Sequence, residues 1–186
     1  MKKTAIVIGH RSKSQGAYSP TLEQTEYEFN KKVALLLQDI ADVYERPDIP
    51  FVSEAFRITE MTKQINKQDY DLVISLHFNS FSNDKAHGVT ALHYITSKFG
   101  KIIADEFCKM VSDDFCIKKR ALIPVASKNE RGGTLICNLK ATAVLVEPFF
   151  GSNPHDAIQF KNKEQEYSKL LRDLINCSQH LKPYNS

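Results

Sequence analysis

The chain has 186 residues, of which 42% are hydrophobic and 25% charged, and its formal net charge is +3. This composition is ordinary for a globular protein, and the length suits one domain over 1–186 with a substantial core. The basic residues are scattered and do not indicate a nucleic-acid binder. No apolar stretch approaches the ~20 residues of a membrane span, so we expect no stable membrane insertion.

The first predicted element is a strand at Thr4–Gly9, a short apolar run typical of a strand buried on both faces. A signal peptide needs an apolar core of about 7–15 residues, and this run is shorter. We therefore expect the protein to be made in the cytoplasm without a signal peptide. The run leads directly into His10.

A long helix is predicted from about Leu22 to Ala41, because Pro20 suits a first turn and Thr21 with Gln24 has the spacing of a capping box. Glu26 falls within ~40° of the centre of the apolar stripe of this helix. A carboxylate there is costly unless it is paired or binds a metal. Alternatively, Glu26 is a surface acid of the first turn, favoured by the helix dipole.

The rest of the chain alternates between apolar strand patterns and amphipathic helix patterns. Strands are predicted at 43–44, 71–76, 88–96, 121–126 and 143–146, and helices at 54–66, 98–111 and 156–181, whereas 132–139 is ambiguous. This alternation predicts an α/β fold with a helix-covered sheet that is mostly parallel or mixed.

Three of the predicted strands end on residues that suit a metal hydrolase, namely His10, His77 and Glu147. Ligands bind beyond the carboxyl ends of parallel strands in open α/β sheets, so these side chains can meet in one place. Singly, each residue also has a structural interpretation. Either histidine could form a hydrogen bond at a strand end, and the carboxylate could pair with an arginine or with backbone donors.

Two histidines and one carboxylate leave a fourth tetrahedral position free for water, which is the pattern of a catalytic zinc site. A second carboxylate could then take a proton from the water and pass it to a leaving nitrogen. On a pleated strand Ser75, His77 and Asn79 share a face, which adds polar groups at the same strand end. His87, beside Gly88 in a polar loop, is a further candidate to line the cleft.

Five segments in this order resemble a known family: IVIGH, EYEFN, DLVISLHFNS, GVTALHY and AVLVEPFFGSN. They are similar to the zinc-dependent N-acetylmuramoyl-L-alanine amidases of bacterial cell-wall autolysins and phage endolysins. The resemblance extends from about Thr4 to about Asn153. It implies a twisted, mostly parallel sheet with helices on both faces.

The resemblance also implies roles for particular residues. One zinc ion is expected on His10, Glu26 and His77, with Glu147 as the catalytic acid and base. Asn79 and Arg57 match further positions of the family pattern, and we consider them, with His87, as candidates for substrate binding. The chain departs from the family at Arg11-Ser12-Lys13, where glycines commonly follow the first histidine.

The resemblance implies cleavage of the amide that joins the lactyl group of N-acetylmuramic acid to L-alanine in peptidoglycan. We expect a monomeric catalytic domain without a separate wall-binding domain. This organisation favours a phage endolysin that reaches the wall after membrane permeabilisation, and a mother-cell amidase of spore release would look similar. Two other functions stay open: another zinc peptidase such as a stem-peptide carboxypeptidase, and a non-catalytic wall-binding relative.

Overall fold

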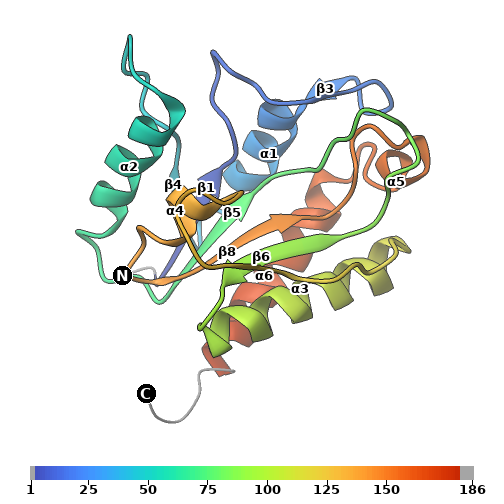
Figure 1. Cartoon of the computed structure of the whole chain (residues 1–186). Coiled ribbons are helices and arrows are strands. Elements are labelled where there is room, and N and C mark those ends of the chain that lie inside the picture. The colour runs from blue at the N-terminus through green and yellow to red at the C-terminus, as the bar shows by residue number, and fades with distance from the viewer. Residues whose placement is uncertain (1–2, 181–186) are drawn as a thin grey trace.

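A six-stranded sheet forms the centre of the protein, and helices cover both of its faces (Figure 1). The computed structural model describes residues 3–180. The strands of the sheet are β1 (Thr4–Ile8), β4 (Asp42–Tyr44), β5 (Leu72–Leu76), β6 (Thr90–Tyr94), β7 (Ile123–Val125) and β8 (Thr142–Glu147). Their order is β4-β1-β5-β8-β6-β7. The first four in this order are parallel, β6 is antiparallel to β8, and β7 is parallel to β6.

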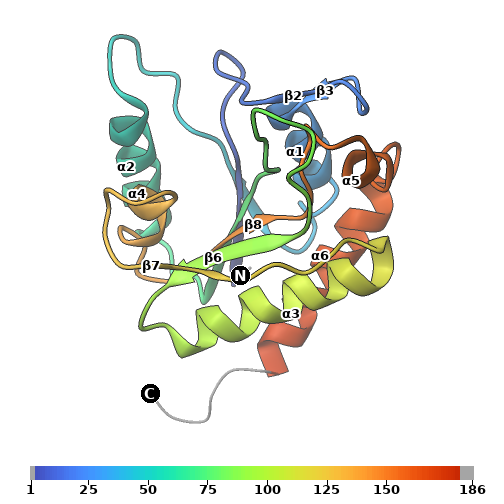
Figure 2. The same cartoon turned by 45° about the vertical axis from the view of Figure 1, so that its right-hand side comes forward.

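The helices divide between the two faces of the sheet. One face carries α1 (Glu26–Leu35), α3 (Lys98–Phe115) and α6 (Glu164–His180), and the other carries α2 (Glu54–Ile65) and α4 (Gly133–Ile136) (Figure 2). Ile6 and Ile8 of β1 belong to the first apolar layer, whereas Ala5 and Val7 belong to the second. This alternation follows from the two-residue period of a strand. It confirms the predicted α/β class with a mixed, mostly parallel sheet and helices on both faces.

An aromatic cluster lies beneath the ends of the central strands. Phe149, just after β8, stacks on Phe160 with ring centroids 4.4 Å apart, and it meets Phe29 of α1 edge-on at 5.5 Å. Phe78, just after β5, lies 5.1 Å from Phe149. Tyr167 of α6 is fully buried against the same cluster. These contacts fix the start of α1 against the ends of β5 and β8, which is where the candidate site lies.

The first helix begins later and ends earlier than the predicted span of 22–41, since it covers Glu26–Leu35, and the expected capping box at Thr21 and Gln24 is wrong. The helix starts at Glu26, where Thr25 is the N-cap and Glu28 completes the capping box. Residues 18–25 instead form a two-stranded ribbon of β2 (Tyr18–Ser19) and β3 (Gln24–Thr25). The result places Glu26 at the very first position of the helix.

The predicted helix over 156–181 is two helices in the structure. The first, α5 (Pro154–Ile158), ends before Asn162, which has a left-handed backbone with φ of 59°. The second, α6, starts at Glu164, and residue 181 lies outside the described residues. The break lets Phe160 turn into the aromatic cluster, where it is fully buried.

The other predicted elements are confirmed with small shifts at their ends. The strands expected at 43–44, 71–76, 88–96, 121–126 and 143–146 are β4, β5, β6, β7 and β8, and the helices at 54–66 and 98–111 are α2 and α3. The ambiguous segment 132–139 contains the short helix α4. Over residues 3–180, none of the helices has the length and apolar character needed to span a membrane.

Candidate active site

The three predicted strand ends lie next to one another at one edge of the sheet. Strands β1, β5 and β8 are neighbours and parallel, so their carboxyl ends share that edge. His10 lies two residues after β1, His77 directly follows β5, and Glu147 is the last residue of β8. Glu26 reaches the same place from the start of α1. The parallel register of the sheet therefore brings together residues that are far apart in the sequence.

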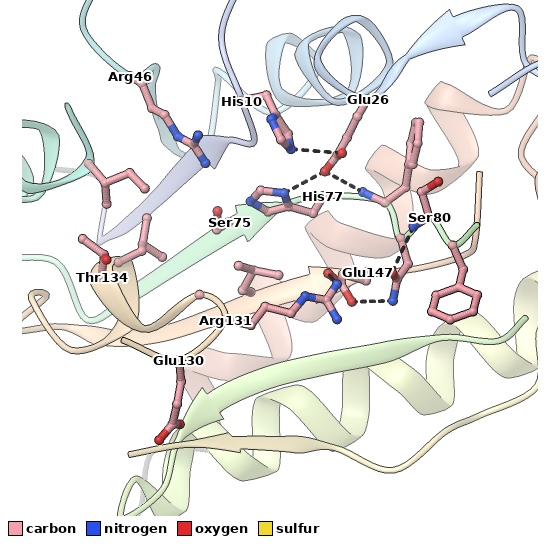
Figure 3. Close-up of a pocket in the computed structure, with 17 residues that line it drawn as sticks. His10, Glu26, Arg46, Ser75, His77, Ser80, Glu130, Arg131, Thr134 and Glu147 are labelled. Carbon is pink, nitrogen blue, oxygen red and sulfur yellow. Dashed lines mark hydrogen bonds and ion pairs between the residues drawn. The ribbon is translucent and has the colours of Figure 1, made fainter. Parts of the chain in front are cut away.

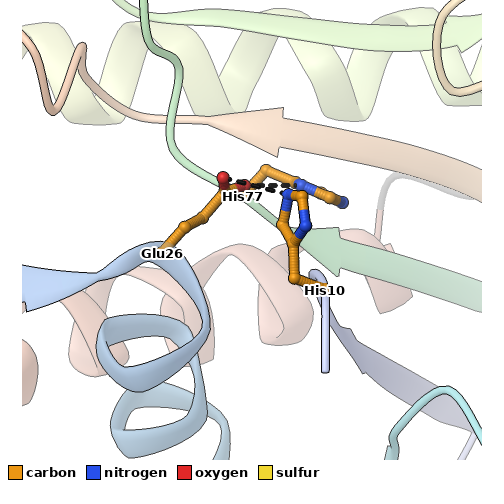
Figure 4. Close-up of side chains that lie close together, drawn as sticks. All are labelled: His10, Glu26 and His77. Atoms are coloured by element: carbon orange, nitrogen blue, oxygen red, sulfur yellow. Dashed lines mark hydrogen bonds and ion pairs between the residues drawn. The ribbon is translucent and has the colours of Figure 1, made fainter. Parts of the chain in front are cut away.

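The carboxylate of Glu26 faces both imidazoles and directs one oxygen toward each (Figure 4). His10 Nε2 is 3.0 Å from Glu26 Oε2, and His77 Nδ1 is 2.7 Å from Glu26 Oε1. One ligand atom from each of the three residues lies within 4.8 Å of the others. We call these three candidate ligands, His10, Glu26 and His77, the metal triad. Nitrogen and carboxylate oxygen donors in this combination are those of catalytic zinc sites.

Backbone groups hold the carboxylate of Glu26 in place. The N–H of Phe78 donates to Glu26 Oε1 at 3.3 Å, and the N–H of Ala17 donates to Glu26 Oε2 at 3.5 Å. Burial raises the pKa of Glu26, but hydrogen bonds from His10 and His77 outweigh this effect and lower the pKa to about 2. Burial lowers the pKa of His77, which favours its neutral, ligating form. An ionised carboxylate beside a neutral imidazole fits a divalent cation.

The loop after His10 has an unusual backbone path. His10 itself has a left-handed backbone with φ of 65°, and Arg11 and Ser14 exchange backbone hydrogen bonds of 3.2 and 2.9 Å. Such a φ is uncommon for a residue with a side chain and is found at functional sites. Gly16 then passes close to the triad, since a Cβ there would lie 2.7 Å from Glu26 Oε2.

Glu147 is buried in the same pocket and has two partners (Figure 3). Asn79 Nδ2 donates to Glu147 Oε2 at 2.9 Å, and the guanidinium of Arg131 pairs with Oε1. Burial raises the pKa of Glu147 to about 7, although the charge of Arg131 opposes this rise. A carboxyl group with a pKa near neutrality can accept and return a proton.

The pocket that contains these groups has a volume of about 490 Å³. This size is within the usual range of about 300–1,000 Å³ for small-molecule sites. Besides the metal triad and Glu147, its walls include Arg46, Ser75, Asn79, Phe81 and Arg131.

Two predicted substrate-binding residues do not line the pocket. Arg57 is buried in α2, where its guanidinium donates to the carbonyls of Ile49 and Val52 and pairs with Glu54. His87 is exposed, and its carbonyl accepts a hydrogen bond from Arg120. This placement gives Arg57 a role in holding the loop before α2 and supports no substrate contact for either residue.

The sequence analysis missed Arg46 and Arg131, both of which line the pocket. Arg46 lies two residues after β4, the parallel neighbour of β1, so the strand-end argument could have found it. Arg131 lies two residues before α4, directly before the segment 132–139 whose secondary structure is ambiguous in the sequence. Only the fold brings it to Glu147.

The fold matches those of an endolysin catalytic domain and of N-acetylmuramoyl-L-alanine amidases. The catalytic domain of the CD27L endolysin, described as targeting Clostridia difficile, is 26% identical and has a TM-score of 0.78, covering 95% of this chain and 98% of that one. The catalytic domain of CwlV, an amidase from Bacillus (Paenibacillus) polymyxa var. colistinus, is 20% identical with a TM-score of 0.74, covering 98% and 100%. An N-acetylmuramoyl-L-alanine amidase from Clostridium difficile 630 is 15% identical with a TM-score of 0.77, covering 98% of each chain.

No curated protein sequence matches the chain. A family model described as N-acetylmuramoyl-L-alanine amidase matches residues 5–176, which include the metal triad, Asn79, Arg131 and Glu147. The chain therefore belongs to the N-acetylmuramoyl-L-alanine amidase family.

Proposed function

We propose that the protein is a zinc-dependent amidase that hydrolyses the bond between the lactyl group of N-acetylmuramic acid and the L-alanine of the stem peptide. One observation carries the proposal. The buried, ionised Glu26 contacts two neighbouring imidazoles, and a second buried carboxylate, Glu147, faces the same pocket. This arrangement separates a metal-binding carboxylate from a carboxylate that can move protons.

His10, Glu26 and His77 would hold the zinc ion. When bound, zinc lowers the pKa of a water ligand toward ~7 and polarises a carbonyl oxygen. Glu147 accepts the proton of the attacking water and returns it to the leaving nitrogen. Its pKa of about 7 allows both steps at neutral pH, because neither protonation state is strongly disfavoured.

Asn79 and Arg131 orient the proton-transferring carboxylate. The amide of Asn79 donates to one oxygen and the guanidinium of Arg131 to the other, so the carboxylate plane is fixed. A fixed base contributes more to the rate than a mobile one, because its geometry is set before the reaction.

The experiment that tests the proposal is digestion of purified peptidoglycan followed by mass spectrometry of the products. We expect whole stem peptides with a new N-terminal alanine and unchanged glycan reducing ends. A chelator should abolish their release, and zinc should restore it. Products cut within the stem peptide would instead identify a peptidase such as a carboxypeptidase. A zinc-replete protein that gives no products would be a non-catalytic relative.

A second measurement isolates the role of Glu147. The Glu147→Ala variant should retain zinc and lose activity by at least about 100-fold, since positioned acid–base groups contribute about 10²–10⁴-fold to rates. Near-normal digestion of walls by this variant would contradict the role. Zinc content measured on the same sample separates loss of chemistry from loss of the metal.

We further propose a lytic role of the phage endolysin type, in which the enzyme reaches the wall from inside the cell after membrane permeabilisation. The likeness to an endolysin catalytic domain at 26% identity supports this role. In a bacterial host whose purified wall the enzyme digests, expression alone should leave cells intact. Permeabilising the membrane should then cause lysis. Lysis without permeabilisation would contradict the proposed route and favour another kind of autolysin.

A further inference from the structure

A cluster of cationic side chains lies beside the His10 loop, and it contains more positive charges than carboxylates to pair with them. Glu54, the first residue of α2, pairs with three arginines at once. Its carboxylate is 3.0 Å from Arg11 Nε, 3.0 Å from Arg57 Nη1 and 3.3 Å from Arg46 Nη1. One negative charge is therefore divided among three guanidinium groups.

The neighbouring pairs do not restore neutrality. Asp48 pairs with Arg11 at 3.4 Å and also with Lys13. Among these described residues, four cations face the carboxylates of Asp48 and Glu54, which leaves an excess of positive charge. Glu26 is within electrostatic reach of Arg46, but its carboxylate is already engaged by the two histidines of the metal triad.

Within this cluster, Arg46 is the cation that lines the pocket and whose N–H donors are mostly unused. Arg57 uses its guanidinium on two backbone carbonyls as well as Glu54, and Arg11 uses its own on Asp48 and Glu54. For Arg46, the structure over residues 3–180 gives only the 3.3 Å contact to Glu54, and its Nε is buried without a partner.

Arg46 also has the position of a ligand-binding group. Its side chain is 12% exposed, lines the pocket, and points toward the space above Ser75 and His77 (Figure 3). Burial lowers the pKa of this guanidinium more than Glu54 raises it, so the pocket wall holds a cation that is only partly compensated. A guanidinium remains charged in proteins and matches a carboxylate with two parallel hydrogen bonds. An anionic ligand would supply the missing charge and acceptors.

We propose that Arg46 binds a free carboxylate of the stem peptide and so determines on which side of the metal triad the peptide lies. This assignment rests on the proposed amidase function. In a stem peptide whose second residue is glutamate linked through its side chain, the α-carboxylate is the negative charge nearest to the scissile amide. When that group is a carboxamide, the charge is absent and the shape is almost unchanged.

The test compares two soluble muramyl pentapeptides that differ only at this group, one with the free α-carboxylate and one with the carboxamide. Release of peptide with an N-terminal alanine is measured for the wild type, Arg46→Gln, Arg46→Lys and Arg172→Gln. The last variant is a matched control, because Arg172 pairs with Asp39 outside the pocket.

The wild type should cleave the carboxylate substrate with a kcat/KM about 10- to 100-fold above that of the carboxamide, the usual effect of one charged hydrogen-bonded pair. Arg46→Gln should lose this preference mainly through a higher KM for the carboxylate substrate, and it should leave the carboxamide substrate little changed. Arg46→Lys should keep part of the preference, since it retains the charge without the planar fork. Arg172→Gln should behave as the wild type.

The assignment of Arg46 fails if the wild type cleaves both substrates equally, a result that needs no variant and does not depend on how the variants fold. It also fails if Arg46→Gln keeps the wild-type ratio. If the wild type releases no alanine-terminated peptide from either substrate or from whole walls, the amidase function itself fails, and the Arg46 assignment fails with it.

Discussion

Arg131 pairs with Glu147 across the pocket, and the two side chains differ greatly in exposure: that of Arg131 is 51% exposed and that of Glu147 is 3% exposed. A solvent-facing cation thus adjusts the proton affinity of a buried carboxylate. Because Arg131 comes from the segment before α4 and Glu147 from β8, the adjustment depends on α4 packing against the sheet.

Replacing Arg131 with glutamine should move the acid limb of the pH–rate profile to higher pH. Burial raises the pKa of Glu147 and Arg131 lowers it, so removing the cation raises it further. A smaller fraction of Glu147 is then ionised at a given pH. On the acid limb of the profile, kcat/KM should therefore fall about threefold to tenfold, and it should recover at high pH. Arg131→Lys, which keeps the charge, is the control. An acid limb at the same pH in both variants would exclude this coupling.

Replacing Glu26 with glutamine should weaken zinc binding by at least about 100-fold, because the only anionic ligand of the metal triad becomes neutral. Zinc titration by calorimetry measures the loss. The increase in melting temperature on adding zinc should disappear as well. Glu28→Gln is a matched control on the same turn, since glutamine can serve in the capping box with Thr25. Wild-type zinc affinity in Glu26→Gln would remove Glu26 from the ligand set.

Replacing Gly16 with alanine should damage the metal site more than the fold. The new Cβ would lie 2.7 Å from both Glu26 Oε2 and His10 Cδ2, on a backbone with φ of 76°. We expect a stability loss of about 1–2 kcal/mol from the left-handed backbone, together with weaker zinc binding as the ligands move apart. Melting curves with and without zinc measure both effects. Ser12→Ala, in the exposed part of the same loop, should change neither, and unchanged zinc affinity in Gly16→Ala would contradict the close approach.

Replacing Tyr167 with phenylalanine should leave the protein as stable or make it about 1 kcal/mol more stable. Its hydroxyl is buried in the aromatic cluster and has no hydrogen-bond partner among residues 3–180, so the fold carries an uncompensated desolvation cost. Urea unfolding measures the change. Phe160→Ala in the same cluster should cost about 3–5 kcal/mol and shows that the assay detects packing losses. A clear destabilisation by Tyr167→Phe would reveal a partner for the hydroxyl.

The strand ends were predictable because buried parallel strands have a simple signature. The apolar runs before His10, His77 and Glu147 each gave a strand in its expected place, and parallel pairing then brought their ends together. Glu26 was identified as a carboxylate on a buried helical stripe. That argument survives the later start of α1, since the first position of the helix faces the same loop.

Other features depended on tertiary contacts that have no local signature. Two capping-box patterns, at Thr21 and at Thr25, follow one another in the sequence, and the β2–β3 ribbon decides in favour of the second. Similarly, the helical pattern continues through Asn162, whereas in the structure the helix breaks there and Phe160 is buried in the aromatic cluster. Arg46 and Arg57 look alike in the sequence. In the structure they differ, because the guanidinium of Arg57 donates hydrogen bonds to two backbone carbonyls.

The reversed direction of β6 has a consequence for how the pocket could change. Because β6 is antiparallel to β8, the segment 77–89 leaves and re-enters the sheet at the same edge, beside the metal triad. Its two ends are anchored by Asn79 to Glu147 and by Gly88 N–H to Asp156, whereas the mostly exposed stretch 80–87 between them is held by contacts such as Phe81 N–H to Ser152 Oγ and Asn153 Nδ2 to the carbonyl of Asp84. Insertions there would reshape the rim of the pocket and leave every strand register intact. This segment is therefore the place where substrate range can be engineered, or can diverge among relatives, without refolding the domain.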